Sequence, residues 1–357
     1  MNHAARIARV QRRLDELEVD ALLITAGTNV RYLTGFSGTN GQVLVTRDEA
    51  VFFSDGRYAA RAASLVQGAE ISIYSARLAD RLVPHLKDEG IARLGFEATT
   101  VTVAGLKEFS EQFPTEMVAT TGVVEQLRRR KDDDEIDRIR EAIRIGDEAF
   151  AWVIDHLAPG RSETEIALAL EVTMRETGAD AVSFDPIVGS GELSAHIHHT
   201  PSDRRFEKGD LVLLDFGCRL DGYCSDLTRT VVLGPATEEQ AAIYELVLEA
   251  QRTGIDAIAA GSSGRDVDAA ARAVIEARGH GDDFGHGLGH GVGLDIHEAP
   301  KLATISTDEL IERDVVTVEP GVYVRDRGGV RIEDCVLVTS SGAEVLGNAP
   351  KDRLIEL

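Results

Sequence analysis

Residues 210–234 read DLVLLDFGCRLDGYCSDLTRTVVLG and carry the strongest fold signal in the chain. Two apolar runs flank the pair Asp221 and Gly222, and an Asp-Gly pair in that setting predicts a two-residue hairpin turn. With this turn, Leu220 would face Tyr223 across the two strands. The stretch therefore predicts an antiparallel hairpin whose register is fixed by its turn.

The register of this hairpin would bring two carboxylates together. Continued from the turn, the pairing places Gly217 opposite Asp226, and Asp215 falls two residues earlier on the same face. A single Asp in a strand is usually a local hydrogen-bonding residue. Two of them among Leu, Val and Phe side chains would repel each other unless cations lie between them. The pair is within reach of two metal ions about 3.5–4 Å apart.

A second segment, HGLGHGVGLDIHEAP at 286–300, interleaves glycine with His286, His290 and His297. Five glycines between residues 285 and 293 disfavour a helix, and no HExxH motif is present. Glycine-dense backbone with interleaved histidine predicts a strand or loop that approaches a ligand closely. Three histidines in twelve residues indicate a site rather than structural histidines.

Two further acids lie in the β-branched segment VVTVEPGVYVRDRGGVRIEDCVLVT at 315–339. Glu319 ends one run before Pro320, and Glu333 is expected inside another run, after a DRGG turn. Carboxylates within strongly apolar strands again need an electrostatic reason to be there.

A charge count links these segments. The four carboxylates carry four negative charges, which two divalent cations would balance. Together with the imidazole of His290 they form a hard, oxygen-rich set that favours Mn²⁺, with Co²⁺ and Zn²⁺ as alternatives. Cys218, Cys224 and Cys335 lie near these residues in sequence and are interpreted as packing residues.

The composition limits the remaining function classes. The chain has 357 residues, with 38 Lys and Arg against 61 Asp and Glu, a formal net charge of −23. Such a surface repels phosphate backbones and anionic lipid, so nucleic acid and membranes are not expected partners. No stretch reads as a signal peptide or a membrane span. An odd cysteine count without framework spacing favours reduced thiols and a cytoplasmic location.

Residues 1–122 are expected to form an α/β domain, because the apolar runs ALLIT, QVLVT, AVFFS, EISIY and LGFE alternate with helical segments. The first helix is amphipathic, with Ile7 and Val10 on its apolar face. A second domain is expected over 123–357. Near its start, the run RRRKDDDE at 128–135 is expected to be a solvated helix surface beside the domain junction.

The second domain contains an internal repeat. Residues 158–179 align with 259–280 at an offset of 101 residues, so that Ser162 matches Ser263. Each copy reads as a glycine, a Ser-led helix start, an amphipathic helix and a glycine stop. Two related halves facing each other would place a site at their pseudo-two-fold interface.

These segments resemble the proline-specific metallopeptidases, a family that includes aminopeptidase P, prolidase and, more distantly, methionine aminopeptidase and creatinase. The resemblance covers essentially the whole chain. It implies a ribonuclease-H-like domain of the creatinase N-terminal type, followed by an α+β pita-bread catalytic domain with a pseudo-two-fold repeat. The matching motifs are NVRYLTGFSGTNG, FSDGRY, HHTPSDRRFEKGDLVLLDFG, YCSDLTRT, FGHGLGHGVGLDIHEAP, TVEPGVY and GGVRIED.

The resemblance implies the metal ligands residue by residue. Asp226 and Glu333 would bridge two metal ions, and Asp215 would bind one of them. His290 and Glu319 would bind the other, and Glu319 would also handle the proton during hydrolysis.

The resemblance also implies substrate-side groups. His198 matches a substrate-side histidine, although Ile197 stands where relatives usually have proline, and His196 and His199 are nearby competitors. His297 and His198 would stabilise the oxyanion or orient the substrate. His286 and Arg331, which match a further histidine and a supporting arginine, would hold the network around the site.

The implied reaction is hydrolysis of the bond between an N-terminal residue and a following proline, by a homodimer. An aminopeptidase is our main expectation, and prolidase, which takes only dipeptides, is the alternative. Prolidase needs a cation or a steric wall for the terminal carboxylate of its substrate. Lys301 could serve, but it is expected at the surface.

Rivals from other classes are disfavoured. A non-catalytic binding module and a creatinase-like enzyme would both be expected to lose metal ligands, and all five are present here. Methionine aminopeptidases usually lack the leading α/β domain. A nucleophile-based hydrolase of the G-x-S-x-G type lacks its motif in this chain.

Overall fold

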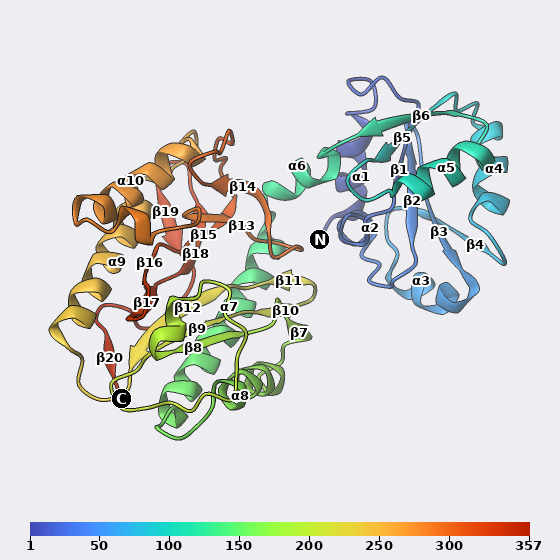
Figure 1. Cartoon of the computed structure of the whole chain (residues 1–357). Helices are drawn as coiled ribbons and strands as arrows, with labels where there is room; N and C mark the ends of the chain where they lie inside the picture. Colours follow the sequence, from blue (N-terminus) through green and yellow to red (C-terminus); the bar gives the residue numbers. More distant parts are fainter. The chain divides into compact units, whose positions relative to one another are not determined.

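A computed structural model describes residues 1–357, which fold as two compact units, Met1–Arg128 and Arg129–Leu357 (Figure 1). This division falls near the end of helix α6 (Val123–Arg129), whereas the sequence analysis places the start of the second domain at residue 123. None of the helices combines the length and the apolar character needed to cross a membrane.

The first unit is built on one six-stranded sheet with the order β4-β3-β2-β1-β5-β6. Strand β2 pairs antiparallel with both β1 and β3. The pairs β3–β4, β1–β5 and β5–β6 are parallel. It is the α/β domain that the sequence predicts. Its strands are β1 (Ala21–Ile24), β2 (Gln42–Thr46), β3 (Ala50–Asp55), β4 (Glu70–Tyr74), β5 (Arg93–Glu97) and β6 (Glu116–Thr120). Its helices are α1 (His3–Gln11), α2 (Gly27–Thr34), η1 (Gly56–Tyr58), α3 (Ala59–Leu65), α4 (Ala79–Asp88) and α5 (Val103–Gln112).

Strand alternation gives this sheet an apolar face for α4. Leu23, Leu44 and Phe53 share one core cluster with Leu82 and Leu86, which lie one helical turn apart on α4. Burying such side chains stabilises the unit by about 1.5–3 kcal/mol each.

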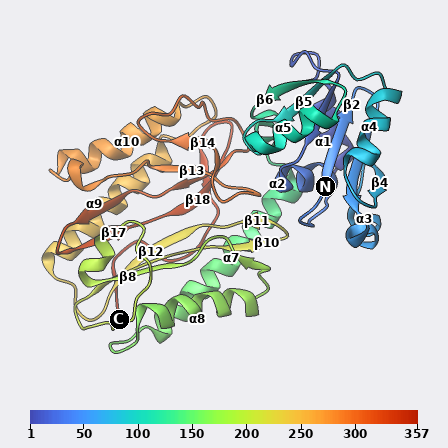
Figure 2. The same cartoon turned by 45° about the vertical axis from the view of Figure 1, so that its right-hand side comes forward.

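The first half of the second unit packs two helices on the sheet β20-β12-β9-β8, and Figure 2 shows α7 and α8 along it. Phe150, Ile166 and Leu170 of these helices form one core with Val212 and Leu214 of the sheet. A small sheet, β11-β10-β7, carries the hairpin tip. The elements are α7 (Asp133–His156), α8 (Glu163–Glu176), β7 (Ala181–Val182), β8 (Ile187–Ser190), η2 (Gly191–Ala195), β9 (Leu211–Phe216), β10 (Cys218–Leu220), β11 (Tyr223–Cys224), β12 (Leu227–Val232) and β20 (Ile355–Glu356).

The second half packs two further helices on the sheet β14-β13-β15-β18-β19. Val267 and Ile275 of α10 share a core with Val316, Val318 and Val336 of that sheet. The elements are α9 (Glu238–Asp256), α10 (Gly264–Ala277), η3 (Gly281–Asp283), β13 (Gly289–Gly291), β14 (Glu298–Leu302), β15 (Val315–Val318), β16 (Gly321–Val324), β17 (Gly328–Arg331), β18 (Asp334–Val338) and β19 (Ala343–Val345).

The predicted internal repeat is confirmed in three dimensions. Helices α8 and α10 begin and end at positions that are both offset by 101 residues. Their N-cap residues are Ser162 and Ser263, as the alignment predicts. Each helix lies against the sheet of its own half, so the two halves are related copies of one helix-and-sheet unit.

The predicted hairpin register is also confirmed. Leu220 pairs with Tyr223, and the same register continues to the pair of Asp215 with Thr228. Asp221 and Gly222 have φ values of 47° and 82°, as a two-residue turn with two left-handed residues requires.

The expectation of a solvated surface over 128–135 is wrong for several residues. Lys131 is 1% exposed, and its Nζ lies 2.7 Å from Oε1 of Glu298. Arg129 is also buried, with Nη2 2.6 Å from Oδ2 of Asp314. Arg129 and Lys131 of this run form ion pairs with the buried side chains of Asp314 and Glu298, which lie far along the chain in the second half.

Candidate metal centre

The hairpin turns Asp215 and Asp226 toward one site. In β9, Val212 and Leu214 pack against α7 and α8, so strand alternation points Asp215 to the opposite face. Asp226 lies between β11 and β12, two residues before Thr228, the direct partner of Asp215. The two carboxylates are therefore diagonal neighbours, as the sequence predicts.

His290 lies on β13, which packs closely between strands β14 and β15. A Cβ at Gly289 would lie 2.1 Å from the carbonyl oxygen of Thr317 on β15. One at Gly291 would lie 2.3 Å from that of Ala299 on β14. The segment contains a strand, one of the two predicted alternatives, its glycines accommodate neighbouring backbone, and Gly289 also lines the pocket described below.

Glu319 and Glu333 come from the same half. Val316 and Val318 point into the core, so alternation turns Thr317 and Glu319 to the other face. Glu319 ends its run as predicted. Glu333 lies in the break between β17 and β18, so its predicted place inside a strand is wrong.

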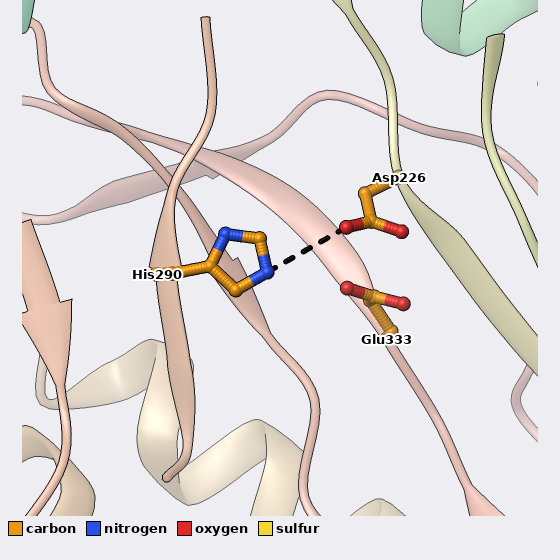
Figure 3. Close-up of side chains that lie close together, drawn as sticks. All are labelled: Asp226, His290 and Glu333. Atoms are coloured by element: carbon orange, nitrogen blue, oxygen red, sulfur yellow. Dashed lines mark ion pairs between the residues drawn. The ribbon is translucent and has the colours of Figure 1, made fainter. Parts of the chain in front are cut away.

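All five predicted metal ligands meet at one site. Ligand atoms of Asp226, His290 and Glu333 all lie within 4.8 Å of one another, and Figure 3 shows these side chains pointing together. Nε2 of His290 lies 3.6 Å from Oδ2 of Asp226 and 3.4 Å from Oε1 of Glu319. Asp215 lines the same pocket.

The electrostatics of this cluster are unfavourable without cations. Burial raises the pKa of Asp226 and of Glu333 well above the usual range, and the surrounding carboxylates raise both further. Burial also raises the pKa of Glu319 to about 7. Like charges held together away from water disfavour their ionised forms.

The residues present fit divalent metal ions. Oδ1 of Asp215 is buried without a hydrogen-bond partner, which is costly for a carboxylate oxygen unless a cation lies against it. Four carboxylates and one imidazole are the hard donors that divalent ions such as Mn²⁺ accept.

Hydrogen bonds hold the candidate ligands in place. Nδ1 of His290 lies 3.0 Å from a backbone carbonyl oxygen, which leaves Nε2 facing the carboxylates. Thr228 donates to Oε2 of Glu333 at 2.7 Å, and Thr317 donates to Oε1 of Glu319 at 3.0 Å. Such bonds orient the side chains before any metal binds.

Comparison with known proteins supplies the identity of this fold and site. Residues 137–340 match the model of metallopeptidase family M24, and residues 6–130 match that of the creatinase/prolidase N-terminal domain. The chain belongs to metallopeptidase family M24. Membership of this family implies divalent metal ions, in agreement with the donor set of the site.

Individual relatives match this M24 chain over nearly its whole length. An Xaa-Pro dipeptidase structure from Bacillus anthracis is 43% identical, with a TM-score of 0.97 and 100% of both chains covered. The Xaa-Pro dipeptidase of Pyrococcus furiosus is 36% identical over 98% of this chain and 99% of its own. An X-Pro aminopeptidase structure from Thermotoga maritima MSB8 is 34% identical, with a TM-score of 0.91, covering 97% of this chain and 100% of its own. The protein is therefore an Xaa-Pro-type metallopeptidase with the pita-bread fold.

A series of hydrogen bonds links Asp215 of the M24 site to three neighbouring side chains, those of Arg331, Tyr323 and His286. Arg331 donates through Nη2 to Asp215 and through Nη1 to the hydroxyl of Tyr323, at 2.8 Å in the second case. That hydroxyl lies 2.9 Å from Nε2 of His286, whose Nδ1 lies 2.8 Å from a backbone carbonyl oxygen. Because Nδ1 must then donate, Nε2 accepts from Tyr323. Burial lowers the pKa of His286 to about 4, in keeping with this neutral form.

The site opens into a pocket of about 900 Å³, the size of a small-ligand site. Among the three competing histidines, His198 lines this pocket, whereas His199 binds Glu163. His297 lines it too, with its ring centroid 4.3 Å from that of His290.

Sequence reasoning does not identify Glu298, which lines this pocket, or Tyr323, which lies behind it against Arg331 and His286. The final letter of TVEPGVY, four residues after Glu319, is a signal that could have drawn attention to Tyr323. The pairing of Glu298 with Lys131 has no local sequence signal, because 167 residues separate them.

Proposed function

We propose that this protein is an Xaa-Pro dipeptidase with a dinuclear metal centre. The observation that carries the proposal is the convergence of the four carboxylates and His290 in one pocket of an M24 fold. Asp226 and Glu333 would bridge two divalent ions. Asp215 would bind one ion, and His290 and Glu319 the other.

Mn²⁺ is the proposed native ion. A thiolate site would offer soft sulfur donors, whereas here the donors are four hard carboxylates and one imidazole. The three cysteines are free and buried, and none lines the pocket. Co²⁺ and Zn²⁺ are alternatives that the same donors accept.

The dipeptidase assignment reverses our expectation from the sequence. The Bacillus anthracis and Pyrococcus furiosus relatives are Xaa-Pro dipeptidases, and they favour that activity. Lys301 lines the pocket, and its ammonium makes no ion pair within the chain. Lys301 is exposed, as expected, and in this proposal it would receive the terminal carboxylate of a dipeptide. The Thermotoga maritima relative keeps an Xaa-Pro aminopeptidase as the second candidate.

The protein residues have separate roles in hydrolysis. When bound, the two cations would supply Lewis-acid activation of a water molecule and of the scissile carbonyl. Glu319 would receive the proton of the attacking water and return it to the leaving nitrogen. His198 and His297 line the pocket and would donate to the oxyanion of the tetrahedral intermediate or orient the substrate.

Arg331 and His286 would act behind these groups. Arg331 fixes Asp215 and, through Tyr323, the neutral tautomer of His286. The homodimer that the resemblance implies stays a prediction.

The test is a comparison of Leu-Pro with Leu-Pro-Gly in the Mn²⁺-loaded enzyme. We expect a clearly higher kcat/KM for the dipeptide. Lys301→Met should raise KM for Leu-Pro about tenfold or more and change kcat less than twofold. Lys208→Met removes another exposed lysine, away from the pocket, and should change neither constant. Faster hydrolysis of the tripeptide would favour the aminopeptidase, and hydrolysis of neither would contradict both.

A further inference from the structure

Each of the two pocket histidines is followed by a residue whose side chain lies within hydrogen-bond distance of a buried partner. His198 precedes His199, whose Nε2 lies 2.8 Å from Oε2 of Glu163. His297 precedes Glu298, whose Oε1 lies 2.7 Å from Nζ of Lys131. The first arrangement is in one half of the repeat, and the second involves the other half.

The contact between His199 and Glu163 connects the irregular loop between η2 and β9 to helix α8. Glu163, in the first turn of α8, is fully buried. Its Oε1 accepts from the backbone N–H and the hydroxyl of Ser190, at 2.9 and 2.7 Å. Its Oε2 accepts from the same two groups of Ser202, at 3.0 and 2.7 Å, besides facing His199. The carboxylate of Glu163 thus connects Ser190, at the end of β8, to His199 and Ser202 in the loop that follows His198.

Backbone N–H groups of Glu163 and Thr164 in α8 also donate to the loop, to the carbonyl oxygens of Arg204 and Ser202 at 3.2 and 3.1 Å. Between η2 and β9 the chain has turns and one isolated bridge, from Ser162 to Arg205. His198 is itself exposed where it lines the pocket, and its imidazole makes no hydrogen bond within the chain. The position of its imidazole therefore depends on the anchored neighbour, His199.

The side chains of the second pair, Lys131 and Glu298, are also buried. Lys131 is 1% exposed, its backbone N–H donates to the carbonyl oxygen of Arg313 at 3.2 Å, and its carbonyl accepts from Nε of Arg313. Glu298 lines the pocket and packs so closely that a Cβ at Gly293 would lie 2.3 Å from Oε1. Glycine at 293 thus leaves space for this carboxylate, and removing the lysine would take away the cation that holds it at this place beside the site.

We propose that Glu163 and Lys131 are positioning residues that act through the neighbouring residue, Glu163 on His198 and Lys131 on His297. The inference rests on the proposed function, in which both histidines act on the substrate. A misplacement of about 1 Å in such a group is enough to cost up to about a hundredfold in rate. A purely structural role would instead lower stability or metal content without regard to either histidine.

Double-mutant cycles separate these two possibilities. The variants are Glu163→Gln, Lys131→Met, His198→Gln and His297→Gln, assayed with Leu-Pro at saturating Mn²⁺. The glutamines retain a hydrogen-bonding side chain, so residual hydrolysis remains measurable. We expect Glu163→Gln to lower kcat about tenfold in the wild-type and His297→Gln backgrounds, but less than twofold in His198→Gln. Lys131→Met should likewise lower kcat about tenfold in the wild-type and His198→Gln backgrounds, but less than twofold in His297→Gln.

The controls test the structural explanation directly. Glu165→Gln removes the other acid in the same turn, which caps α8 and whose hydrogen bonds go to Arg161 and Ser162 outside the loop, and should leave kcat within twofold of wild type. Metal content and Tm are measured for every variant. If Glu163→Gln does not fold, Ser202→Ala takes its place in the cycle, because it removes the hydroxyl donor to the same carboxylate and keeps the backbone N–H donor.

The outcomes are distinct. Equal losses in all backgrounds, or losses that follow metal content or Tm, would overturn the positioning roles. A wild-type enzyme that does not hydrolyse Leu-Pro would overturn the proposed function instead.

Discussion

Arg331 and Asp215 form a buried ion pair in which Nη2 of the arginine donates to Oδ2 of the aspartate. The other oxygen, Oδ1, is buried and has no hydrogen-bond partner. One oxygen is thus held by the protein, and the other is turned into a cluster of acids whose pKa values are raised. This division of one carboxylate between a structural partner and an open site underlies the dinuclear centre that we propose.

Tyr323 connects Arg331 with His286, and its hydroxyl can be removed without changing the shape of the ring. Tyr323→Phe should lower kcat/KM by about thirtyfold at most, because two hydrogen bonds of roughly 1 kcal/mol each, to Arg331 and His286, are lost. Steady-state kinetics with Leu-Pro measure the effect. Tyr244→Phe is the matched control, since that buried hydroxyl donates to a backbone carbonyl at 2.9 Å away from the pocket. Equal losses in both variants would argue against a specific role for Tyr323.

The acids of the centre make the stability of the metal-free protein depend on pH. The folded state holds Glu319 at a pKa of about 7, above the ordinary value of 4.5, so between these values it binds more protons than the unfolded state. Its contribution therefore falls as pH rises through this window, by about 3 kcal/mol at most. Asp226 and Glu333 shift in the same direction.

Thermal unfolding in EDTA between pH 5 and pH 8 measures this effect. The Tm of the metal-free protein should fall toward pH 8, and the rise in Tm on adding Mn²⁺ should grow with pH, because binding displaces protons. Glu319→Gln should make the metal-free profile shallower. A stabilisation by Mn²⁺ that is independent of pH would contradict the assignment of these carboxyls as ligands.

Gly289 has no space for a side chain, because a Cβ would lie 2.1 Å from the carbonyl oxygen of Thr317. Gly289→Ala must push β13 away from β15 and should cost about 1–3 kcal/mol or more. Since His290 lies on the displaced strand, we also expect a lower affinity for Mn²⁺. Urea unfolding and metal titration check the two effects. Gly342→Ala, where a Cβ meets nothing within 4 Å, should be neutral in both.

The sequence was most informative where local geometry decides the outcome. The turn at Asp221 and Gly222 determines the register, and alternation in β9 then determines the side on which Asp215 lies. The repeat similarly located α8 and α10, because the same capping and stop signals recur in both copies. The glycines of β13 were recognised as a sign of close approach, although the approaching groups proved to be neighbouring strands.

Residues that depend on distant partners could not be predicted in this way. Arg129 and Lys131 read as surface charges, because Asp314 and Glu298 lie 185 and 167 residues further along the chain. The position of Glu333 in a break between strands likewise depends on tertiary contacts, since its backbone N–H donates to the carbonyl oxygen of Thr228 in the other half.

The central claim is that two metal ions, held by the five converging side chains, are needed for hydrolysis. The most direct measurement is activity toward Leu-Pro as Mn²⁺ is added to the metal-free enzyme, with bound metal counted by elemental analysis. The account predicts that full activity needs two ions per chain, and that Glu333→Ala loses both metal loading and activity. Full activity with one ion or none bound would contradict it.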